Sequence, residues 1–579
     1  MTQDVPSRRE MTASRAAAWV RRIDYTALVW VLVTLLLILL VVNPIYFLLQ
    51  ESFIPSEENG AGWSFINYIQ AFTNPLYYSP IVVTFIISIS AGVGSLIVGA
   101  IMAWCVSRTD MPAPGLIRNS VLAAFVTPPF LGAIAWIFLA GPRAGWLNVA
   151  FRWLIGGGGE TSLLNIFSLP GVIFAITLYT FPLVFIVVLA GLNNISSDIE
   201  DAANIAGGGT FSTMMRITLP LVLPALFAGF ILAVLEAMIL FGIPAILAIP
   251  AGYNTMTTQL RAFMTSEDNL LGVAAAYSMP MLIAAIWMVW MRAKVLGRRG
   301  YATVGGKGGQ RRPQKLGPWR YPVFLLCFFP VLCSLFLPYF ALVSTSFMNT
   351  LGAGLTWSNM TLANYIFMIQ NDAVRGAITN TVILALMAAT GATALASISA
   401  YISQRKLVRG HGFLGFMATL PIGIPGIVLA VGLFAAYTKP PFVLYDTLWI
   451  LFLAYMTKYL PLAFQTSNAA LTSIHPELEE CSRILGANRL QVFKDVTVPL
   501  FKTGLIASWI LVFMPSLREL SSSILLYTTN TKVISAVILD LYDETLFGPI
   551  SAIGVLLLAI TLASIAIGFR LIGRDFLRT

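Results

Sequence analysis

The chain has 579 residues, of which 58% are hydrophobic and only 10% are charged, and its mean hydropathy is +0.83. This composition excludes an ordinary soluble globular protein and indicates a chain that lies in a lipid bilayer. The net charge of +10 makes nucleic-acid binding an alternative, but the basic residues are distributed as in a membrane protein, and we expect no nucleic-acid partner.

Twelve apolar segments are long enough to cross the hydrocarbon core of a bilayer, which requires about 20 residues of helix. The first segment is too long for the core of a signal peptide and has no small-residue cleavage site, so we expect it to be retained. The sequence therefore predicts an all-α integral membrane protein. The predicted spans are residues 27–50, 80–106, 117–140, 171–192, 220–248, 271–292, 321–345, 376–403, 412–437, 446–470, 500–526 and 549–573.

The basic residues predict the orientation of the chain. Five arginines precede the first span, whereas residues 51–79, between the first two spans, contain no lysine or arginine. Because cytoplasmic loops carry the excess of basic residues, the N-terminus is predicted to be cytoplasmic. An even number of spans then places the C-terminus in the cytoplasm as well. We expect a multi-pass protein of the bacterial plasma (inner) membrane.

A long internal repeat divides the chain into two halves. Residues 175–221 align without a gap on residues 454–500, at an offset of 279. Upstream, Asn67 and Tyr68 match Asn364 and Tyr365, and residues 52–53 match residues 346–347. Six spans separate equivalent points, so the two halves are predicted to be parallel six-helix repeats about an axis along the membrane normal.

This repeat gives four segments. We predict a cytoplasmic N-terminal segment (residues 1–26), a first six-helix domain (27–297), a glycine-rich basic linker (298–320) and a second six-helix domain (321–579). The linker has no apolar periodicity and is predicted to lie in the cytoplasm.

Each half contains a predicted cytoplasmic loop with the same unusual chemistry, at about residues 196–220 and 475–499. Acidic residues, two small residues and a glycine are followed nine residues later by a short segment that ends in proline. Acidic residues favour the start of a helix and glycine favours its C-terminal turn, so each loop is predicted to form a short surface helix. The alternative is a pair of capped turns that only join spans. The residues are Glu200, Asp201, Ala202, Ala203 and Gly207 in the first copy, and Glu479, Glu480, Cys481, Ser482 and Gly486 in the second.

These loops resemble the EAA motif of type I ABC importer permeases, which is Glu-Ala-Ala, three residues, Gly, nine residues, Ile, one residue and Leu-Pro. Asp201 replaces a glutamate in the first copy, and Cys481-Ser482 replaces the alanine pair in the second. The resemblance covers essentially the whole chain and implies a permease with two fused domains. It also implies that each loop is a coupling helix that docks on one of two separate ATPase subunits. ATP and magnesium would bind there, so this chain would need no cofactor and would not be an enzyme.

Further segments are similar to the fused branch of that family, which includes ferric-iron, thiamine and aminoethylphosphonate importers. They are Phe241-Gly242-Ile243-Pro244-Ala245 with Thr257-Thr258, and the segment from Arg518 to Ser523. The resemblance implies an external binding protein that delivers a small solute. Ferric iron is the favoured cargo, and aminoethylphosphonate, thiamine and polyamines are competitors. The alternative function is a twelve-helix secondary transporter driven by an ion gradient, which explains the parallel halves but not the loops.

Four ionisable residues in or at the end of spans are candidates for the cargo pathway: Glu236, Lys458, Arg518 and Glu519. Inserting one such charged side chain into the membrane costs at least about 2.5 kcal/mol, so a functional role is the default hypothesis for each. The alternative is that these residues pair with one another. Mid-span Pro182 and Pro461 occupy equivalent positions and are candidates for a gate. We predict no catalytic residues and no metal site, because both histidines fall in cytoplasmic loops and no catalytic constellation is present.

Overall fold

The computed structural model describes residues 26–55, 62–155, 162–195, 199, 202–203, 205–267, 270–297, 313–354 and 356–572. The predicted N-terminal segment, most of the predicted linker, and Glu200 and Asp201 therefore lie outside the described residues. Within the described residues the chain is helical, and β pairing is limited to two isolated bridges, Thr109 with Gln314 and Met348 with Met360. The predicted all-α fold is confirmed.

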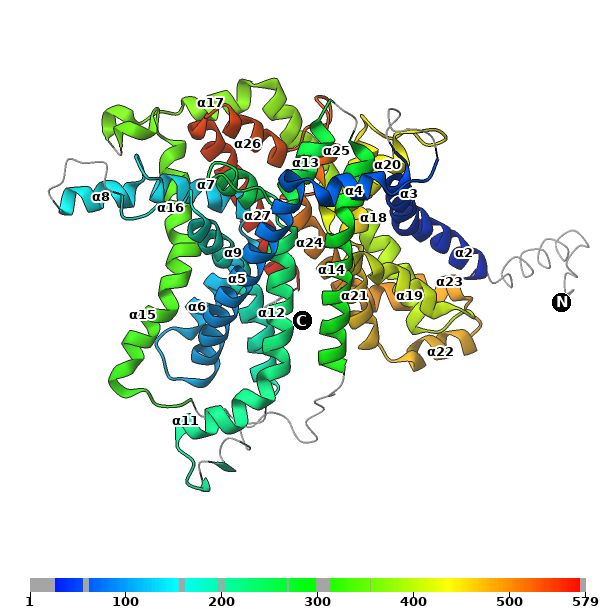
Figure 1. Cartoon of the computed structure of the whole chain (residues 1–579). Coiled ribbons are helices and arrows are strands. Elements are labelled where there is room, and N and C mark those ends of the chain that lie inside the picture. The colour runs from blue at the N-terminus through cyan, green and yellow to red at the C-terminus, as the bar shows by residue number, and fades with distance from the viewer. Residues whose placement is uncertain are drawn as a thin grey trace, which may run out of the picture.

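The long helices of the first half are joined by short helices at both ends of the molecule (Figure 1). The long elements are α2 (Thr26–Leu37), η1 (Ile38–Val42), α3 (Asn43–Phe53), α5 (Pro75–Arg108), α6 (Pro114–Val126), α7 (Pro129–Ala140), α9 (Leu169–Asn193), α12 (Leu219–Ile239) and α14 (Leu271–Gly297). The short ones are α4 (Ile66–Thr73), α8 (Trp146–Leu154), α11 (Thr210–Thr213), η3 (Met214–Thr218), η4 (Pro244–Ala248) and α13 (Met256–Thr265).

The second half repeats this order. Its long elements are α15 (Arg320–Val331), η6 (Leu332–Phe336), α16 (Leu337–Ser346), α18 (Asp372–Gln404), α19 (His411–Thr419), α20 (Gly426–Tyr437), α21 (Leu448–Thr472), α24 (Val498–Leu517) and α27 (Phe547–Ile572). The short ones are η5 (Gly317–Trp319), η7 (Leu351–Ala353), η8 (Trp357–Asn359), α17 (Ala363–Gln370), η9 (Leu420–Gly423), α22 (Pro476–Ile484), α23 (Arg489–Val492), η10 (Phe493–Thr497), α25 (Ser523–Leu526) and α26 (Ile534–Asp543).

Among the described residues, nine helices are long and apolar enough to cross a membrane, and two sharply bent helix pairs raise that number to eleven. The remaining predicted span, residues 446–470, corresponds to the 25-residue helix α21. The bent pairs are the predicted third and ninth spans, α6 with α7 at 104° and α19–η9 with α20 at 111°. Thr127 and Ile424 lie at these breaks, each directly before a proline, and both are extended because proline disfavours the helical conformation of the preceding residue.

The predicted fifth and eleventh spans are shorter than expected. The sequence predicts helices to residues 248 and 526, but α12 ends at Ile239 and α24 ends at Leu517. In each half the apolar sequence continues beyond the helix as a separate short segment. Because hydropathy alone does not report a change of direction, the prediction joined each segment to the preceding helix.

The internal repeat is reproduced in atomic detail. The hydroxyls of Ser52 and Tyr68 lie 2.8 Å apart, and those of Ser346 and Tyr365 also lie 2.8 Å apart. A turn of π-helix precedes α12 and α24 at matched positions. The first, η3, ends at Thr218, and the second, η10, ends at the equivalent Thr497. The two halves therefore share local geometry as well as sequence.

The two halves interlock through their first helices. In the first half, α3 packs against α20 of the second, and α16 of the second half packs against α7 of the first. Tyr437 donates a hydrogen bond to the carbonyl of Leu39 at 2.9 Å, and the Trp136 indole donates to the carbonyl of Cys333 at 3.2 Å. Both bonds join the two halves, which therefore pack directly against each other.

Candidate functional site

The two predicted coupling segments lie at one end of the molecule, opposite the end that carries α13, α17 and α26 (Figure 1). Helix α22 forms the second copy, and the described residues 199, 202–203 and 205 of the first copy are helical. Large apolar side chains are exposed there: Ile205 is 89% exposed, Ile484 83% and Leu485 88%. Exposed apolar residues gathered on such a surface are typical of a docking site for another protein.

Both segments end in the same glycine turn. Gly207 has φ +84° and Gly486 has φ +94°, a left-handed conformation that other residues adopt at a cost. The amide of Gly208 donates to the carbonyl of Ala203 at 2.9 Å, and the amide of Ala487 donates to the carbonyl of Ser482 at 3.2 Å. These are equivalent bonds of a Schellman turn, which is the C-terminal turn that the sequence predicted.

Glu479 anchors α22 to the membrane helices. Its side chain is only 7% exposed, and its carboxylate accepts hydrogen bonds from Arg405 Nε at 3.0 Å, Thr497 Oγ1 at 3.1 Å and the Tyr401 hydroxyl at 3.3 Å. The three donors lie on or beside α18 and on η10. Glu480, by contrast, is exposed.

The sequence analysis missed Arg405, although it could have found it. At the offset of 297 that relates Asn67 to Asn364, Arg405 is equivalent to Arg108, which is buried. Arg108 donates to the carbonyl of Leu192 at 2.9 Å, and Arg405 donates to that of Ile474 at 3.1 Å. A basic residue in the same place in both halves was the available signal.

A cavity of about 280 Å³ lies between the halves, and we call it the central cavity. All four predicted pathway residues line it, which the sequence alone did not establish. Residues of α9, of the α6–α7 break, and of the end of α12 with the segment after it contribute the rest of the wall from the first half. The polar and charged lining residues are Tyr179, Glu236, Lys458, Tyr459, Arg518, Glu519 and Ser521.

Two of the predicted pathway residues form an ion pair. Lys458 Nζ lies 2.7 Å from Glu519 Oε2 and 2.8 Å from Oε1. Glu519 also accepts hydrogen bonds from the Tyr459 hydroxyl and from Ser522, whose amide and hydroxyl lie at 3.0 and 2.9 Å. These contacts are all within the second half, and they satisfy both oxygens of the carboxylate.

Arg518 is held by the other half. Its guanidinium donates to the carbonyls of Phe125 at 3.1 Å, Thr127 at 3.2 Å and Val126. These carbonyls belong to the end of α6, where the break before α7 leaves them without helical partners. A positive charge at a helix C-terminus is also favoured by the helix dipole.

Glu236 has a different environment. Its side chain is exposed to the central cavity, and no hydrogen bond or ion pair joins it to another described residue. Lys458 and Arg518 make their direct contacts elsewhere, but both lie near enough to interact electrostatically with the Glu236 carboxylate. The pairing of Glu236 with these cations stays a prediction.

Pro182 and Pro461 are buried inside α9 and α21, which remain helical through them. Leu183, directly after Pro182, and Tyr459, two residues before Pro461, line the central cavity. Their role in gating stays a prediction.

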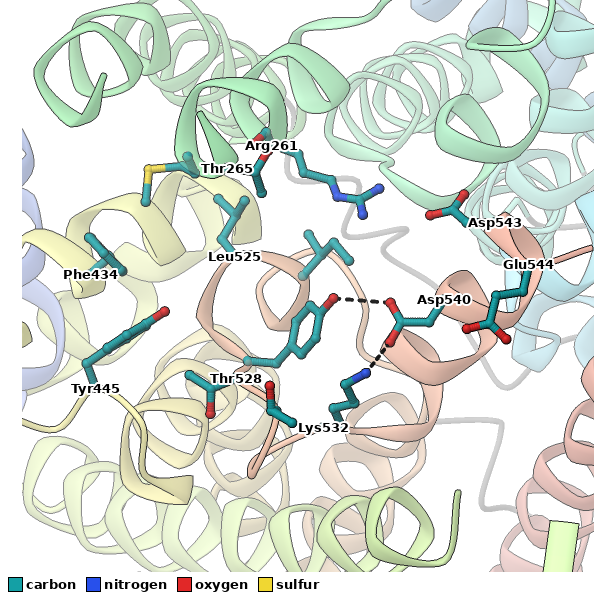
Figure 2. Close-up of a pocket in the computed structure, with 14 residues that line it drawn as sticks. Arg261, Thr265, Phe434, Tyr445, Leu525, Thr528, Lys532, Asp540, Asp543 and Glu544 are labelled. Carbon is teal, nitrogen blue, oxygen red and sulfur yellow. Dashed lines mark hydrogen bonds and ion pairs between the residues drawn. The ribbon is translucent and has the colours of Figure 1, made fainter. Parts of the chain in front are cut away.

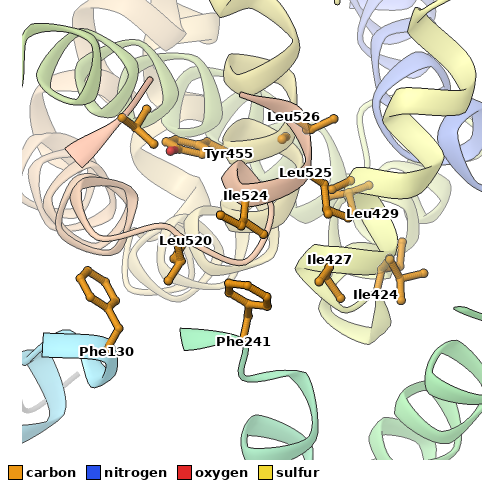
Figure 3. Close-up of a cluster of buried hydrophobic side chains, with 14 of the residues drawn as sticks. Phe130, Phe241, Ile424, Ile427, Leu429, Tyr455, Leu520, Ile524, Leu525 and Leu526 are labelled. Carbon is orange, nitrogen blue, oxygen red and sulfur yellow. The ribbon is translucent and has the colours of Figure 1, made fainter. Parts of the chain in front are cut away.

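An apolar barrier closes the central cavity on one side. Phe130 and Phe241 of the first half lie opposite Leu520 and Ile524 of the second (Figure 3), and all four are buried. Gly242 permits this approach, because a Cβ there would lie 2.7 Å from Phe130 Cβ and 3.1 Å from Leu520 Cδ2. Phe130 lies in α7, whereas Phe241, Leu520 and Ile524 lie in the segments that follow α12 and α24, which the sequence predicted as parts of spans.

A larger cavity of about 590 Å³ lies beyond the barrier, between α13 and α26, and we call it the distal cavity. Figure 2 shows Arg261 extending from α13 toward the space that Asp540 and Asp543 also face. Asp540 accepts hydrogen bonds from Lys532 at 2.6 Å and from the Tyr527 hydroxyl at 3.3 Å. Burial and the nearby Asp540 carboxylate raise the pKa of Tyr527 to about 12. The sequence analysis did not predict these residues, because α26 lies between the predicted spans.

The two halves, their shared coupling segments and the cavity between them define a transport protein of the ABC importer class. The sequence matches the family described as binding-protein-dependent transport system inner membrane component over residues 59–296 and again over residues 395–575, and the chain belongs to that family. It is thus a transport subunit that spans the inner membrane, with two permease domains fused in one polypeptide.

Similar proteins include the ferric transport system permease protein FbpB of Actinobacillus pleuropneumoniae, which is 24% identical over 480 residues, 82% of this chain and 68% of the relative. The Fe(3+)-transport system permease protein FbpB 2 of Haemophilus influenzae is 23% identical over 465 residues, 78% of this chain and 82% of the relative. The spermidine/putrescine transport system permease protein PotC of Escherichia coli is 25% identical over 241 residues, 42% of this chain and 90% of the relative.

Proposed function

We propose that this permease imports ferric iron into the cytoplasm, powered by two separate ATPase subunits and supplied by an external binding protein. The observation that carries the ATP-driven mechanism is the pair of matched coupling segments, exposed at the same end of the molecule. ATP and magnesium bind in the partner subunits. The two termini and the coupling segments lie in the cytoplasm.

The arrangement of the cavities supports alternating access. The segment from Arg518 to Ser521 lines the central cavity. Ile524, Leu525 and the residues from Tyr527 to Thr529 line the distal cavity on the other side of the barrier. Movement of the two halves, driven through the coupling segments, would part Phe130 and Phe241 from Leu520 and Ile524. Cargo would then pass from the distal cavity to the central one.

The names of the relatives support the choice of cargo. Two permeases that match most of this chain are named for ferric iron, whereas the spermidine and putrescine permease matches one half of it. Aminoethylphosphonate, thiamine and polyamines remain the competing cargoes. Both kinds of cargo named by these relatives are cationic.

The test is reconstitution in liposomes with the ATPase subunits and the binding protein. We expect the purified chain alone to hydrolyse no ATP, and the complete complex to take up ⁵⁵Fe(III) only when ATP is present on the side of the coupling segments. Uptake by the chain without an ATPase would overturn the mechanism. ATP-dependent uptake of ¹⁴C-labelled spermidine, thiamine or aminoethylphosphonate, without uptake of iron, would replace the cargo.

A further inference from the structure

Helix α8 of the first half presents an apolar face away from the protein. Its exposed side chains are those of Val149 (48% exposed), Trp153 (82%) and Leu154 (73%), together with Ala150. These residues are three and four positions apart, so they share one face of the helix. A surface helix in water normally has the opposite arrangement, with its polar residues on the outside.

The polar side chains of α8 face the protein instead. Asn148 is fully buried, and its amide nitrogen donates hydrogen bonds to the carbonyls of Gly141 at 3.0 Å and Leu164 at 2.8 Å. Its side-chain oxygen accepts a hydrogen bond from the amide of Leu164 at 2.9 Å. Arg152 donates to two backbone carbonyls of the turn before the helix, at 2.6 and 3.3 Å. These bonds fix the orientation of α8, so its apolar face cannot turn inward unless they break.

The position of α8 places the apolar face beside the membrane. Figure 1 shows α8 extending sideways from the bundle, next to α16. The ring of Trp146 packs edge-to-face on that of Phe340 in α16, with 5.9 Å between the ring centroids. Phe340 is 54% exposed on a candidate membrane span that ends at Ser346, about 9 Å further along the helix. The start of α8 therefore lies just inside the external end of that span, at the depth of the lipid headgroups.

The length and composition of α8 suit a helix that lies along a membrane surface. Its nine residues extend for about 13 Å, which is too short to cross roughly 30 Å of hydrocarbon. Tryptophan is enriched at the boundary between membrane and water. Residues 141–155 contain two arginines and no acidic residue, which suits lipid phosphate groups. The corresponding connection of the second half, residues 438–447, contains no helix.

We infer that α8 is an interfacial helix, which lies in the external leaflet of the membrane with Val149, Trp153 and Leu154 among the lipid acyl chains. Its apolar face continues the lipid-facing surface of α16. The inference goes beyond the proposed function, because it involves neither the cargo nor the ATPase. Since α8 directly follows α7, which carries Phe130 of the apolar barrier, the lipid would hold one end of that helix in the first half alone.

Spin-label accessibility in lipid nanodiscs tests this position. The full chain carries Cys481→Ser, because Cys481 is exposed and the other three cysteines are buried, and a nitroxide is attached through Ala150→Cys. We expect the label to collide several-fold more often with O₂, which concentrates in lipid, than with a water-soluble nickel chelate. Leu154→Cys repeats the measurement one turn further along. The matched control is Trp357→Cys, at a 90% exposed tryptophan of η8, where the opposite preference is expected.

A second substitution shows whether the apolar face causes this preference. Trp153→Asp, added to the chain labelled at Ala150→Cys, should raise nickel accessibility several-fold, because a carboxylate is costly among acyl chains, whereas Trp153→Phe should not. Nickel accessibility at position 150 equal to that at position 357 would overturn the inference. A label that is accessible to nickel in the nanodisc and becomes protected only when the external binding protein is added would also overturn it, and would assign this face to that protein. If one labelled variant does not insert, the other decides by the same measurement.

Discussion

The two halves of this permease have closely similar structures at the end of the molecule that carries the predicted coupling segments, which we call the coupling end. They differ in the central cavity. At the coupling end, both copies have a glycine with positive φ, the same Schellman bond and a turn of π-helix before the next span. In the cavity, Tyr179 of the first half stands where the second half has Lys458, and Pro515 stands at the position equivalent to Glu236. Three of the four charged lining residues come from the second half.

This difference separates two demands on the molecule. Two matched surfaces suit two equivalent partners that push on the bundle from one side. A single cargo molecule that passes between the halves, however, need not have two-fold symmetry. The residues that surround it can therefore differ between the two halves. We therefore expect substitutions at the coupling end to act equally in either half, and substitutions in the cavity to act unequally.

The largest effect is expected from the coupling glycines. Replacing both Gly207 and Gly486 with valine should abolish uptake, because a β-branched residue at positive φ costs about 1–2 kcal/mol and would unwind or redirect the docking helix. Each single substitution should produce a similar loss. Uptake and ATPase activity in liposomes measure the effect, and membrane insertion should be normal.

Gly209→Val is the matched control for these substitutions. Gly209 lies in the same loop, its added Cβ would meet no atom within 4 Å, and its φ is outside the left-handed region. Normal transport by the double glycine variant, or an equal loss in Gly209→Val, would contradict the role of the turn. A loss confined to one of the two single variants would show that the coupling surfaces are not equivalent.

The second prediction concerns the ion pair that is present in one half alone. Lys458→Met should destabilise the protein by about 3 kcal/mol, because it leaves the Glu519 carboxylate buried without its cation. The double variant with Glu519→Gln should recover part of that loss. Thermal unfolding of the purified chain measures both, and Lys502→Met, at an exposed lysine, is the control. A double variant less stable than Lys458→Met would show that the pair is not the main partner of these residues.

The sequence predicted the spans, the repeat and the coupling turns well, because each leaves a local signature. The length of an apolar segment indicates a membrane helix, and a glycine at a fixed distance from acidic residues indicates a capped turn. The same local reasoning failed at Ile239 and Leu517, where apolar sequence continues although the helix ends. Beyond Ile239 the chain packs closely against Phe130 and Leu520, as at Gly242, and the sequence of one segment does not contain that information.

The partners of the charged residues could not be predicted for a related reason. Lys458, Arg518, Glu519 and Glu236 were all found from the sequence, but several pairings were equally possible. Arg518 has backbone carbonyls as partners, and these became available only because α6 breaks at Thr127. The break in α6 and the partners of Arg518 thus depend on each other in three dimensions.

The third prediction tests the anchor of α22. Glu479→Gln should lower stability by about 2 kcal/mol and reduce uptake several-fold, because the neutral amide loses the charge-assisted contacts with Arg405 and disturbs those with Thr497 and Tyr401. Glu480→Gln is the neighbouring comparison, since Glu480 is exposed. It should leave the stability of the chain unchanged and affect only its affinity for the ATPase. Equal thermal stability of the two variants would contradict the anchoring role.

The smallest effect is expected from a contact that joins the halves near α3. Lys439 Nζ lies 2.6 Å from Glu51 Oε1, and the lysine side chain is 61% exposed whereas the carboxylate is nearly buried. Lys439→Met should therefore cost about 1 kcal/mol, more than a fully exposed pair because Glu51 is left without its cation, and less than the Lys458 variant because water reaches the site. The control is Arg375→Met, which removes an exposed pair with Asp372 and should change the unfolding temperature very little. A loss of stability in Lys439→Met as large as in Lys458→Met would show that the halves depend as much on this contact as on the pair within the cavity.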